Sequence, residues 1–315
     1  MRFTARAAKA QRSRLTPEPM RTLRVPASSA NLGPGFDALG LAIDAHLVCR
    51  FRAAPQLAIR ATGRDAARIS TGEDNLIWQT ALAVAADVGR MCPSIELEIA
   101  NEIPIGKGLG SSAAALVAGV VIANEVLKLE WHRSRVLSEA AKIEGHPDNV
   151  AASVLGSLVA SAIDAEQRVR FVRLEIDPKI EISVVVPDYE LPTSEARRVL
   201  PDSCSRDDAI FNVQRSTLLI AALTTGTLEA FPMALEDRLH QPYRFALVPG
   251  LEEIVKLAAP GLLGCALSGA GPSILVFHER GRGDVCRLVT DVFAQHGSAS
   301  EVLPARIAIA GYTLS

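Results

Sequence analysis

The segment Pro104–Ala114, which reads P-I-G-K-G-L-G-S-S-A-A, constrains the fold of this chain more than any other stretch. It lies between a predicted strand at Ser94–Ile99 and a predicted helix at Ser111–Leu129. Its three glycines stand at alternate positions, where the missing Cβ lets the backbone turn tightly and approach a ligand. Unpaired amide groups and the positive end of the helix dipole meet at such a helix start, so the segment is typical of a phosphate-binding loop. A serine hydroxyl at this place can also ligate a magnesium ion.

Two familiar phosphate-binding patterns do not fit this segment. The P-loop needs Lys followed by Ser or Thr, whereas Lys107 is followed by Gly108. The dinucleotide fingerprint G-x-G-x-x-G, counted from Gly106, needs a glycine where Ser111 stands. A glycine-rich turn before a closely packed helix of small residues therefore remains the alternative interpretation.

The composition limits the partners of the chain. With 33 basic and 35 acidic residues among 315, the formal net charge of -2 argues against a nucleic-acid binder that relies on bulk positive charge. An apolar fraction of 49% is too high for a disordered protein. The longest low-charge stretches, Ser111–Ala123 and Asn149–Ile163, are shorter than the ~18–20 residues of a membrane-spanning helix. We expect neither a nucleic-acid nor a membrane partner.

The cysteines and the N-terminal residues indicate the cellular compartment of the protein. The five cysteines are scattered, without a CxxC pair or a Cys/His cluster at metal-ligand spacing, which fits a reducing, cytoplasmic setting. Residues Met1–Pro19 are basic, with Glu18 as their only acid, and we expect a disordered leader there. An upstream start codon, with Met20 as the first natural residue, and a transit peptide are the alternatives.

Helices and strands are predicted to mix throughout, which indicates an α+β chain. The predicted strands are Thr22–Ala27, Ala38–Ala53, Gln56–Ala61, Ser94–Ile99, Val169–Ile176, Ile180–Val186, Ala266–Ser268, Ser273–Phe277 and Ala305–Ala310, with Val150–Ile163 as buried strand and turn. The predicted helices are Asn75–Val88, Ser111–Leu129, His132–Lys142, Thr193–Leu200, Asp207–Thr224, Leu228–Leu239 and Gly283–Gln295. Near residues 163–169 charged residues become more frequent and the pattern of predicted strands and helices begins again. We therefore expect two domains, over residues 20–168 and 169–315.

Two further glycine-containing segments accompany the loop. They are Ser28–Gly40, S-S-A-N-L-G-P-G-F-D-A-L-G, and Leu267–Phe277, L-S-G-A-G-P-S-I-L-V-F. Together with Pro104–Ala114, and in this order, they resemble the motifs of the GHMP small-molecule kinases, over nearly the whole chain from Met20 onward. The resemblance implies an N-terminal domain like domain 2 of ribosomal protein S5, a ferredoxin-like C-terminal domain, and ATP bound in the cleft between them.

Three other segments are similar to those of the homoserine kinases within this family: Glu144–Val150, Val186–Pro201 and Asp237–Gly250. This similarity implies transfer of the γ-phosphoryl group of ATP to the side-chain hydroxyl of L-homoserine, giving O-phospho-L-homoserine for threonine biosynthesis. It also implies a homodimer. The alternatives are another GHMP kinase, acting on a sugar, an isoprenoid alcohol or shikimate, and a non-catalytic ligand-binding member of the fold.

The resemblance also implies roles for single residues. Asp37 would face the substrate ammonium, while Arg197 and Arg244 would hold its carboxylate in the planar fork that suits bidentate pairing. The residues implied to contact the amino acid are Asn31, Asp37, His146, Asn149, Thr193, Arg197, Arg244 and Gly269. Ser112 and Glu144 would ligate Mg²⁺, which prefers hard oxygen ligands, and with Arg197 they form the implied catalytic set.

The nucleotide phosphates would lie on the loop itself. The residues implied to bind them are Pro104, Ile105, Gly106, Lys107, Gly108, Leu109, Gly110, Ser111, Ser112, Ala113 and Ala114. Ser268–Gly271 would shape the site near the transferring phosphate. No base is assigned, Asp148 included, because a loose, metaphosphate-like transition state depends mainly on positioning and electrostatics.

Ordinary structural roles are the alternatives for several of these residues. His146 would then cap a turn, Asp37 would bond to its own backbone, and Arg197 would face solvent from its helix. The side chain of Lys107 either contacts phosphate or points to water.

Overall fold

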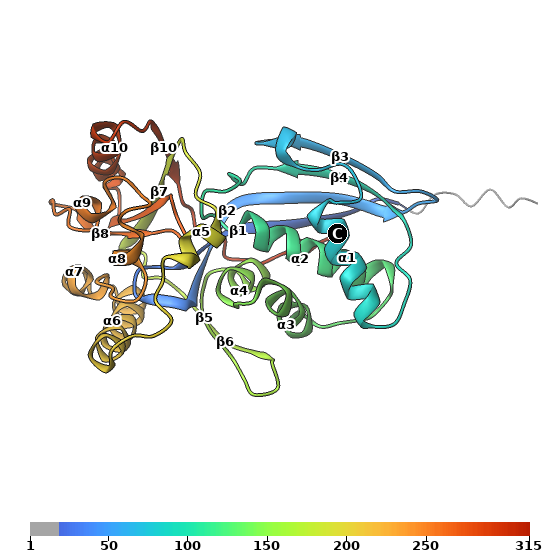
Figure 1. The fold of residues 1–315 in the computed structure, drawn as a ribbon, viewed down its shortest axis with the longest axis horizontal. Coiled ribbons are helices and arrows are strands. Elements are labelled where there is room, and N and C mark those ends of the chain that lie inside the picture. Colours follow the sequence, from blue (N-terminus) through green and yellow to red (C-terminus); the bar gives the residue numbers. More distant parts are fainter. Residues whose placement is uncertain (1–18) are drawn as a thin grey trace, which may run out of the picture.

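The computed structural model describes residues 19–315, which build two sheets and the helices that cover them (Figure 1). The predicted leader, residues 1–19, lies outside the described residues except for its last position. Among residues 19–315, no helix has the length and apolar composition that crossing a bilayer requires.

The larger sheet has seven strands, and helices α1–α4 lie along one side of it (Figure 1). Its central path runs β11-β1-β2-β4-β3, and β5 and β6 extend it from β2. The strands are β1 Arg21–Asn31, β2 Gly35–Ala53, β3 Ala58–Gly63, β4 Ile95–Asn101, β5 Leu158–Ile163, β6 Val169–Leu174 and β11 Thr313–Leu314. The helices are α1 Leu76–Asp87, α2 Ser111–Val126, α3 Arg133–Glu144 and α4 Asp148–Leu155, with a 3-10 turn at Ala66–Arg68.

The smaller sheet has four antiparallel strands in the order β10-β7-β9-β8. Its strands are β7 Ile180–Pro187, β8 Leu262–Leu267, β9 Ile274–Glu279 and β10 Ser300–Pro304. Its helices are α5 Thr193–Arg198, α6 Arg206–Thr225, α7 Phe231–Ala234, α8 Gln241–Arg244, α9 Leu251–Ile254 and α10 Cys286–Gln295, with 3-10 turns at Leu228–Ala230 and Gly283–Val285. With α6 after β7 and α10 after β9, this is the β-α-β-β-α-β order of a ferredoxin-like fold, so that prediction is confirmed.

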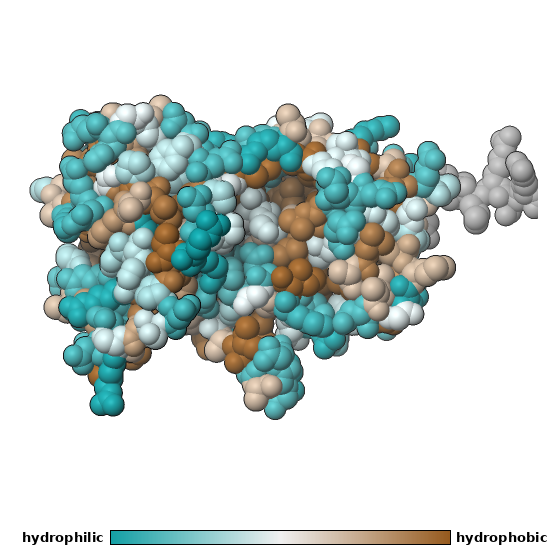
Figure 2. Space-filling view, viewed as in Figure 1, coloured by the Kyte–Doolittle hydropathy of each residue, from teal (hydrophilic) through white to brown (hydrophobic). Residues whose placement is uncertain are grey.

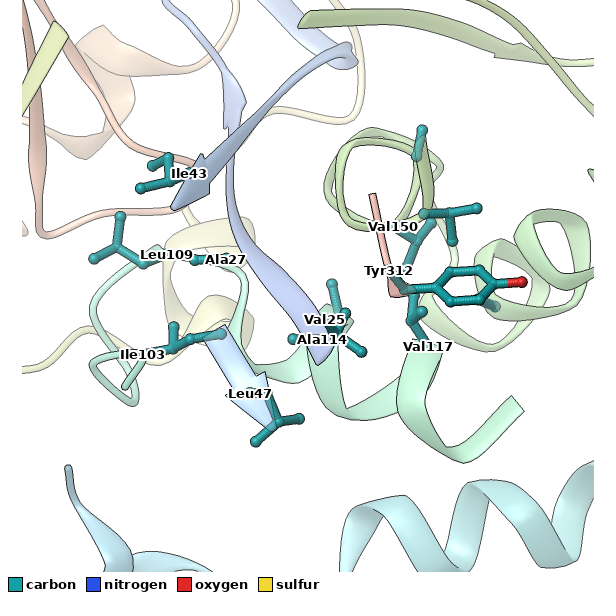
Figure 3. Close-up of a cluster of buried hydrophobic side chains, with 14 of the residues drawn as sticks. Val25, Ala27, Ile43, Leu47, Ile103, Leu109, Ala114, Val117, Val150 and Tyr312 are labelled. Atoms are coloured by element: carbon teal, nitrogen blue, oxygen red, sulfur yellow. The ribbon is translucent and has the colours of Figure 1, made fainter. Parts of the chain in front are cut away.

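Helix α2 forms the centre of the larger core. All of its residues from Ala113 to Asn124 except Ala115 are buried, which explains its lack of an amphipathic pattern. Ala114 and Val117 of this helix pack in one cluster with Val25 of β1 (Figure 3). Small side chains allow this close approach, and they fix the helix whose N-terminus ends the glycine-rich loop.

Two segments that were predicted as strands have another structure. Val150–Ile163 was expected as strand and turn, but α4 extends to Leu155 before β5 begins. Most residues of α4 are buried, and periodicity does not separate a fully buried helix from a strand. The strand expected at Ala305–Ala310 is absent among the described residues; this segment makes one isolated bridge, from Ile307 to Ile43.

The helix expected at Leu228–Leu239 is also wrong. Pro232 lies in the first turn of a new short helix, α7, which ends at Ala234. The carboxylate of Asp237 then accepts hydrogen bonds from the backbone amides of Leu239, His240 and Gln241, at 2.9, 3.1 and 2.6 Å. Such local bonds compete with helical ones and bend the chain.

The larger sheet takes strands from both ends of the chain. Strand β6 pairs with β5 along its whole length, so the boundary expected between residues 168 and 169 falls between two paired strands, and the smaller sheet begins with β7. Strand β11 returns to pair with β1, and Thr22 and Ser315 exchange backbone hydrogen bonds of 2.8 and 2.9 Å.

Candidate active site

A cavity of about 250 Å³ is lined by residues from both parts of the molecule, the one built on the larger sheet and the one built on the smaller sheet. Figure 2 shows the surface hollowed near the middle of the visible face, between the two parts of the molecule. All eight residues predicted to contact the amino acid line the cavity, as do the predicted metal ligands Ser112 and Glu144. Residues from distant parts of the sequence therefore meet as the resemblance implies.

The glycine-rich loop forms one wall of this cavity. Gly106, Gly108 and Gly110 have φ angles of 74°, 75° and 68°, a region that side chains disfavour. A Cβ on Gly108 would stand 2.2 Å from the carbonyl oxygen of Ser268. One on Gly110 would stand 2.1 Å from the hydroxyl of Ser28. The glycines thus make room for neighbouring protein segments as well as for a ligand, a need that the sequence did not reveal.

The predicted phosphate-binding residues are divided by the fold. The cavity is lined by Ile105, Gly106, Gly108, Leu109, Gly110, Ser111 and Ser112. Ala113 and Ala114 are fully buried in the core, and Pro104 is buried before the loop turns.

Lys107 points away from the cavity. Its ammonium donates to the carbonyl oxygens of Pro187, at 3.0 Å, and Tyr189, at 2.6 Å. Burial lowers the pKa of Lys107, although nearby carboxylates, Glu190 first, oppose this effect. The side chain therefore ties the loop to the end of β7, an outcome that neither sequence alternative contained.

Asp37 and Arg197 pair with each other across the cavity. The guanidinium donates to both carboxylate oxygens, at 2.7 and 3.2 Å. Asn31 holds the start of β2, which carries Asp37, because its side-chain oxygen accepts from the backbone amide of Asp37 at 3.0 Å. The amide group of Asn31 donates in turn to the carbonyl of Gly269, also at 3.0 Å. The two predicted substrate contacts, Asp37 and Arg197, thus pair with each other in this structure.

Arg244 is a second guanidinium in the same wall, and only 1% of it is exposed. It donates from Nε to the carbonyl of Ala196 and from Nη1 to the carbonyl of Gly269, at 3.1 and 3.2 Å. Burial and the charge of Arg197 lower the pKa of Arg244 to about 10. The cavity therefore offers two guanidiniums, Arg197 and Arg244, that suit an anionic ligand group, beside the carboxylates of Asp37, Glu144 and Asp148.

The start of α4 brings a histidine and a carboxylate together. Nδ1 of His146 lies 2.6 Å from Oδ1 of Asp148, which also accepts from the backbone amide of Asn149. Burial lowers the pKa of His146, but the hydrogen bond and charge of Asp148 outweigh it, and the net change is upward. The side chain of Asn149 accepts from the hydroxyl of Ser28 at 3.0 Å.

Ser112 and Glu144 offer hard oxygen atoms beside the loop. Ser112 belongs to the first turn of α2, where amide groups are unpaired. Burial raises the pKa of Glu144, while His146, Arg197 and the hydroxyl of Ser112 lower it. A divalent cation at this place would offset the burial of the carboxylate, so the residues fit a Mg²⁺ site.

A second cavity, of about 310 Å³, adjoins the first on the other side of the loop. The two share Ile105, Ser111 and Ser112. Its remaining wall includes apolar side chains such as Leu47 and Ile99. This arrangement places an apolar compartment and a polar one on either side of the N-terminus of α2.

Among the residues of the polar cavity that sequence reasoning missed, Phe36 and Asp148 contact the predicted site residues most directly. Phe36 lines the cavity and lies under both guanidiniums, with ring-to-Cζ distances of 5.6 Å for Arg197 and 5.9 Å for Arg244. Its place beside Asp37 in the first motif was the available signal. Asp148 was considered only as a base, whereas the structure shows it supporting His146.

Two family models match the chain. The model for the GHMP kinases N terminal domain matches residues 75–157, and the model for GHMP kinases C terminal matches residues 219–287. The first covers the glycine-rich loop and the second covers the core of the smaller sheet. With the fold and the site, these matches define the class of the protein as a GHMP kinase.

Comparison with individual proteins narrows the class. A homoserine kinase of Solibacter usitatus is 63% identical in an alignment that covers 93% of this chain and 96% of the relative. A homoserine kinase of Deinococcus radiodurans is 42% identical in an alignment that covers 92% of this chain and 95% of the relative. A homoserine kinase structure from Cytophaga hutchinsonii is 27% identical with a TM-score of 0.81, covering 95% and 98%. The chain belongs to the homoserine kinases.

Proposed function

We propose that the protein transfers the γ-phosphoryl group of ATP to the side-chain hydroxyl of L-homoserine, giving O-phospho-L-homoserine and ADP. One observation carries the proposal: a single cavity holds Asp37, Arg197 and Arg244 beside the glycine-rich loop. An α-amino acid brings one ammonium and one carboxylate, and this cavity offers a partner for each. The high identity to named homoserine kinases supports the same conclusion.

The ion pair between Asp37 and Arg197 can be exchanged for ion pairs with a bound amino acid. A zwitterion entering the cavity replaces one internal pair by two new ones, ammonium to Asp37 and carboxylate to the guanidiniums. Since both partners are about one-third exposed, with 34% and 37% of their side chains accessible, opening the pair costs little. A neutral sugar has neither charge, and mevalonate and shikimate carry a carboxylate without an ammonium, so none of them replaces the pair by two new ones.

The nucleotide is assigned to the adjoining compartment. The apolar cavity suits a purine base, and the phosphates then extend over the N-terminus of α2, where the loop amides and the helix dipole favour negative charge. The γ-phosphoryl group would reach the wall that both cavities share, near Ser112.

Ser112 and Glu144 would hold the magnesium ion, which supplies charge neutralisation for the phosphates when bound. The protein's own part is positioning and electrostatics. Arg197 and the loop amides face the place where negative charge develops, and a loose transition state asks little of a base. Asn31 and Asn149 keep the substrate wall rigid through their hydrogen bonds to the protein.

The test measures ADP formation with a panel of alcohols: L-homoserine, L-serine, mevalonate, galactose and shikimate. We expect magnesium-dependent ADP release with L-homoserine, at a kcat/KM far above that for the other alcohols. Equal rates across the panel, or a preference for an alcohol without the ammonium and carboxylate pair, would contradict the proposal and leave the fold assignment intact.

We further propose a homodimer acting in the cytoplasm, as expected from the sequence. Light scattering coupled to size exclusion measures the mass directly, and a monomer across micromolar concentrations contradicts the dimer. Fractionation of the source cells tests the compartment.

A further inference from the structure

A fully buried histidine lies directly behind the substrate cavity. His240 places Nε2 at 2.7 Å from the carbonyl oxygen of Gly33 and Nδ1 at 2.9 Å from Nη1 of Arg244. A carbonyl only accepts a hydrogen bond, so Nε2 carries a proton. A guanidinium only donates, so Nδ1 carries none. The two contacts therefore define a neutral imidazole with one fixed tautomer.

The same ring supports the cavity wall from behind. His240 stacks on Phe36 with ring centroids 5.2 Å apart and an interplanar angle of 23°. The hydrogen bonds of Arg244 to the described residues use Nε and Nη1, which leaves Nη2 as its donor for a ligand. The direction of that free donor is set by the acceptors that hold the other nitrogens, and Nδ1 of His240 is the acceptor that is not a backbone carbonyl.

We propose that His240 is a positioning residue for the substrate carboxylate: its unprotonated Nδ1 holds the guanidinium of Arg244 toward the cavity, and protonation of the ring releases it. The proposal rests on the proposed function, since it concerns the residue that would bind the carboxylate of homoserine. It adds a group that touches no substrate atom and that the motif comparison did not single out.

The charged groups around His240 determine when it protonates. Asp237 lies 3.5 Å away on its own segment, Arg244 on α8, and Asp37 faces it from β2. Burial is the largest influence and lowers the pKa of His240; Arg244 lowers it further, while Asp237, Asp37 and the Gly33 bond raise it, with a net downward change. The ring therefore stays neutral at neutral pH, and Arg244 loses its acceptor only toward the acid end.

Two substitutions separate the two ends of the ring. His240→Asn places a side-chain oxygen near the position of Nδ1 and loses the bond to Gly33. His240→Gln reaches toward the position of Nε2 and loses the acceptor for Arg244. We expect His240→Asn to keep KM for homoserine within about threefold, and His240→Gln to raise it about tenfold or more with KM for ATP unchanged, as for a lost bond to a charged group.

The pH profile supplies a readout that simple packing would not change. KM for homoserine in the wild-type protein should rise toward acid pH, and this rise should be weaker in His240→Asn, because an amide does not titrate. His146 titrates in both proteins and so cancels in the comparison. Imidazole nitrogen chemical shifts of the wild-type protein report the tautomer without any variant, and should show an unprotonated Nδ1 at neutral pH.

The outcomes distinguish the two proposals. A wild-type protein without homoserine-dependent ADP release refutes the proposed function and this inference with it. An active wild-type protein in which both variants raise KM equally, in which the acid rise is unchanged in His240→Asn, or in which Nδ1 is protonated at neutral pH, refutes the inference alone. If either variant fails to fold, the nitrogen shifts decide.

Discussion

Replacing Arg197 with alanine separates what one guanidinium contributes to stability from what it contributes to substrate binding. In the structure this group makes two hydrogen bonds to Asp37, with 37% of the arginine side chain exposed. An ion pair so open to solvent contributes about 1 kcal/mol at most. For a chain of this length the melting temperature should fall by no more than about 3 °C.

The effect on catalysis should be larger. With substrate bound, Arg197 is expected to face a carboxylate inside the cavity, where the loss of charge-assisted hydrogen bonds costs about 2–3 kcal/mol. That free energy corresponds to a fall in kcat/KM for homoserine of roughly 30- to 150-fold. KM for ATP should hardly change, because the adjoining cavity lacks this residue.

Arg198→Ala is the matched control, since Arg198 follows Arg197 in α5 and is exposed. Steady-state rates of ADP formation at varied homoserine and saturating ATP, with thermal melts of all three proteins, measure both effects. If Arg197→Ala keeps kcat/KM within about threefold of the wild type, Arg197 does not hold the substrate. If it melts far below the control, its role is structural.

Three further substitutions test the walls of the site. Gly108→Ala should lower the free energy of unfolding by about 2 kcal/mol or more and abolish activity, because its φ is 75° and its Cβ would meet Ser268; Gly89→Ala, with a φ of 67° and open space, is the control in thermal melts. Lys107→Met should cost about 1–2 kcal/mol of stability in urea titrations, through two lost hydrogen bonds, and only a modest rise in KM for ATP; a large rise at unchanged stability would instead place its ammonium on phosphate. Glu144→Gln should raise the Mg²⁺ concentration for half-maximal rate about tenfold or more in a metal titration, and an unchanged titration would remove Glu144 from the metal site.

The motifs named residues that line one cavity, whereas the periodicities missed several elements. Residues such as Asn31, His146 and Arg244 are far apart in the sequence, yet they line one cavity. A motif could predict this because it implies both a local backbone conformation and the segments that the motif contacts. What the motifs did not predict is the contact between Asp37 and Arg197. Pairing of Asp37 with Arg197 follows from opposite charges left facing each other, which a list of substrate contacts does not convey.

Two of the three failures among the elements depend on which residues the fold buries. Helix α4 is buried on most of its surface, so its apolar run had no solvent-facing side to mark the period of 3.6. In Ala305–Ala310 the buried positions are Ala305 and Ala308, three apart, which a strand with alternating sides does not produce. Tertiary burial, rather than local propensity, decided both segments.

The return of β11 to β1 makes the smaller sheet, in topological terms, an insertion within the larger one. A ribosome releases β1 almost 300 residues before its neighbour Thr313–Leu314, so the larger sheet has a vacant edge until that strand has been synthesised. A fragment cut after β6 would lack that edge strand, and we expect it to be less stable than its buried core suggests. Conversely, the paired residues Thr22 and Ser315 suit a short covalent link in a variant without the residues before Thr22, with new termini opened in an exposed loop such as the tip of the β5–β6 hairpin, which projects from the molecule and is mostly hydrophilic (Figures 1 and 2).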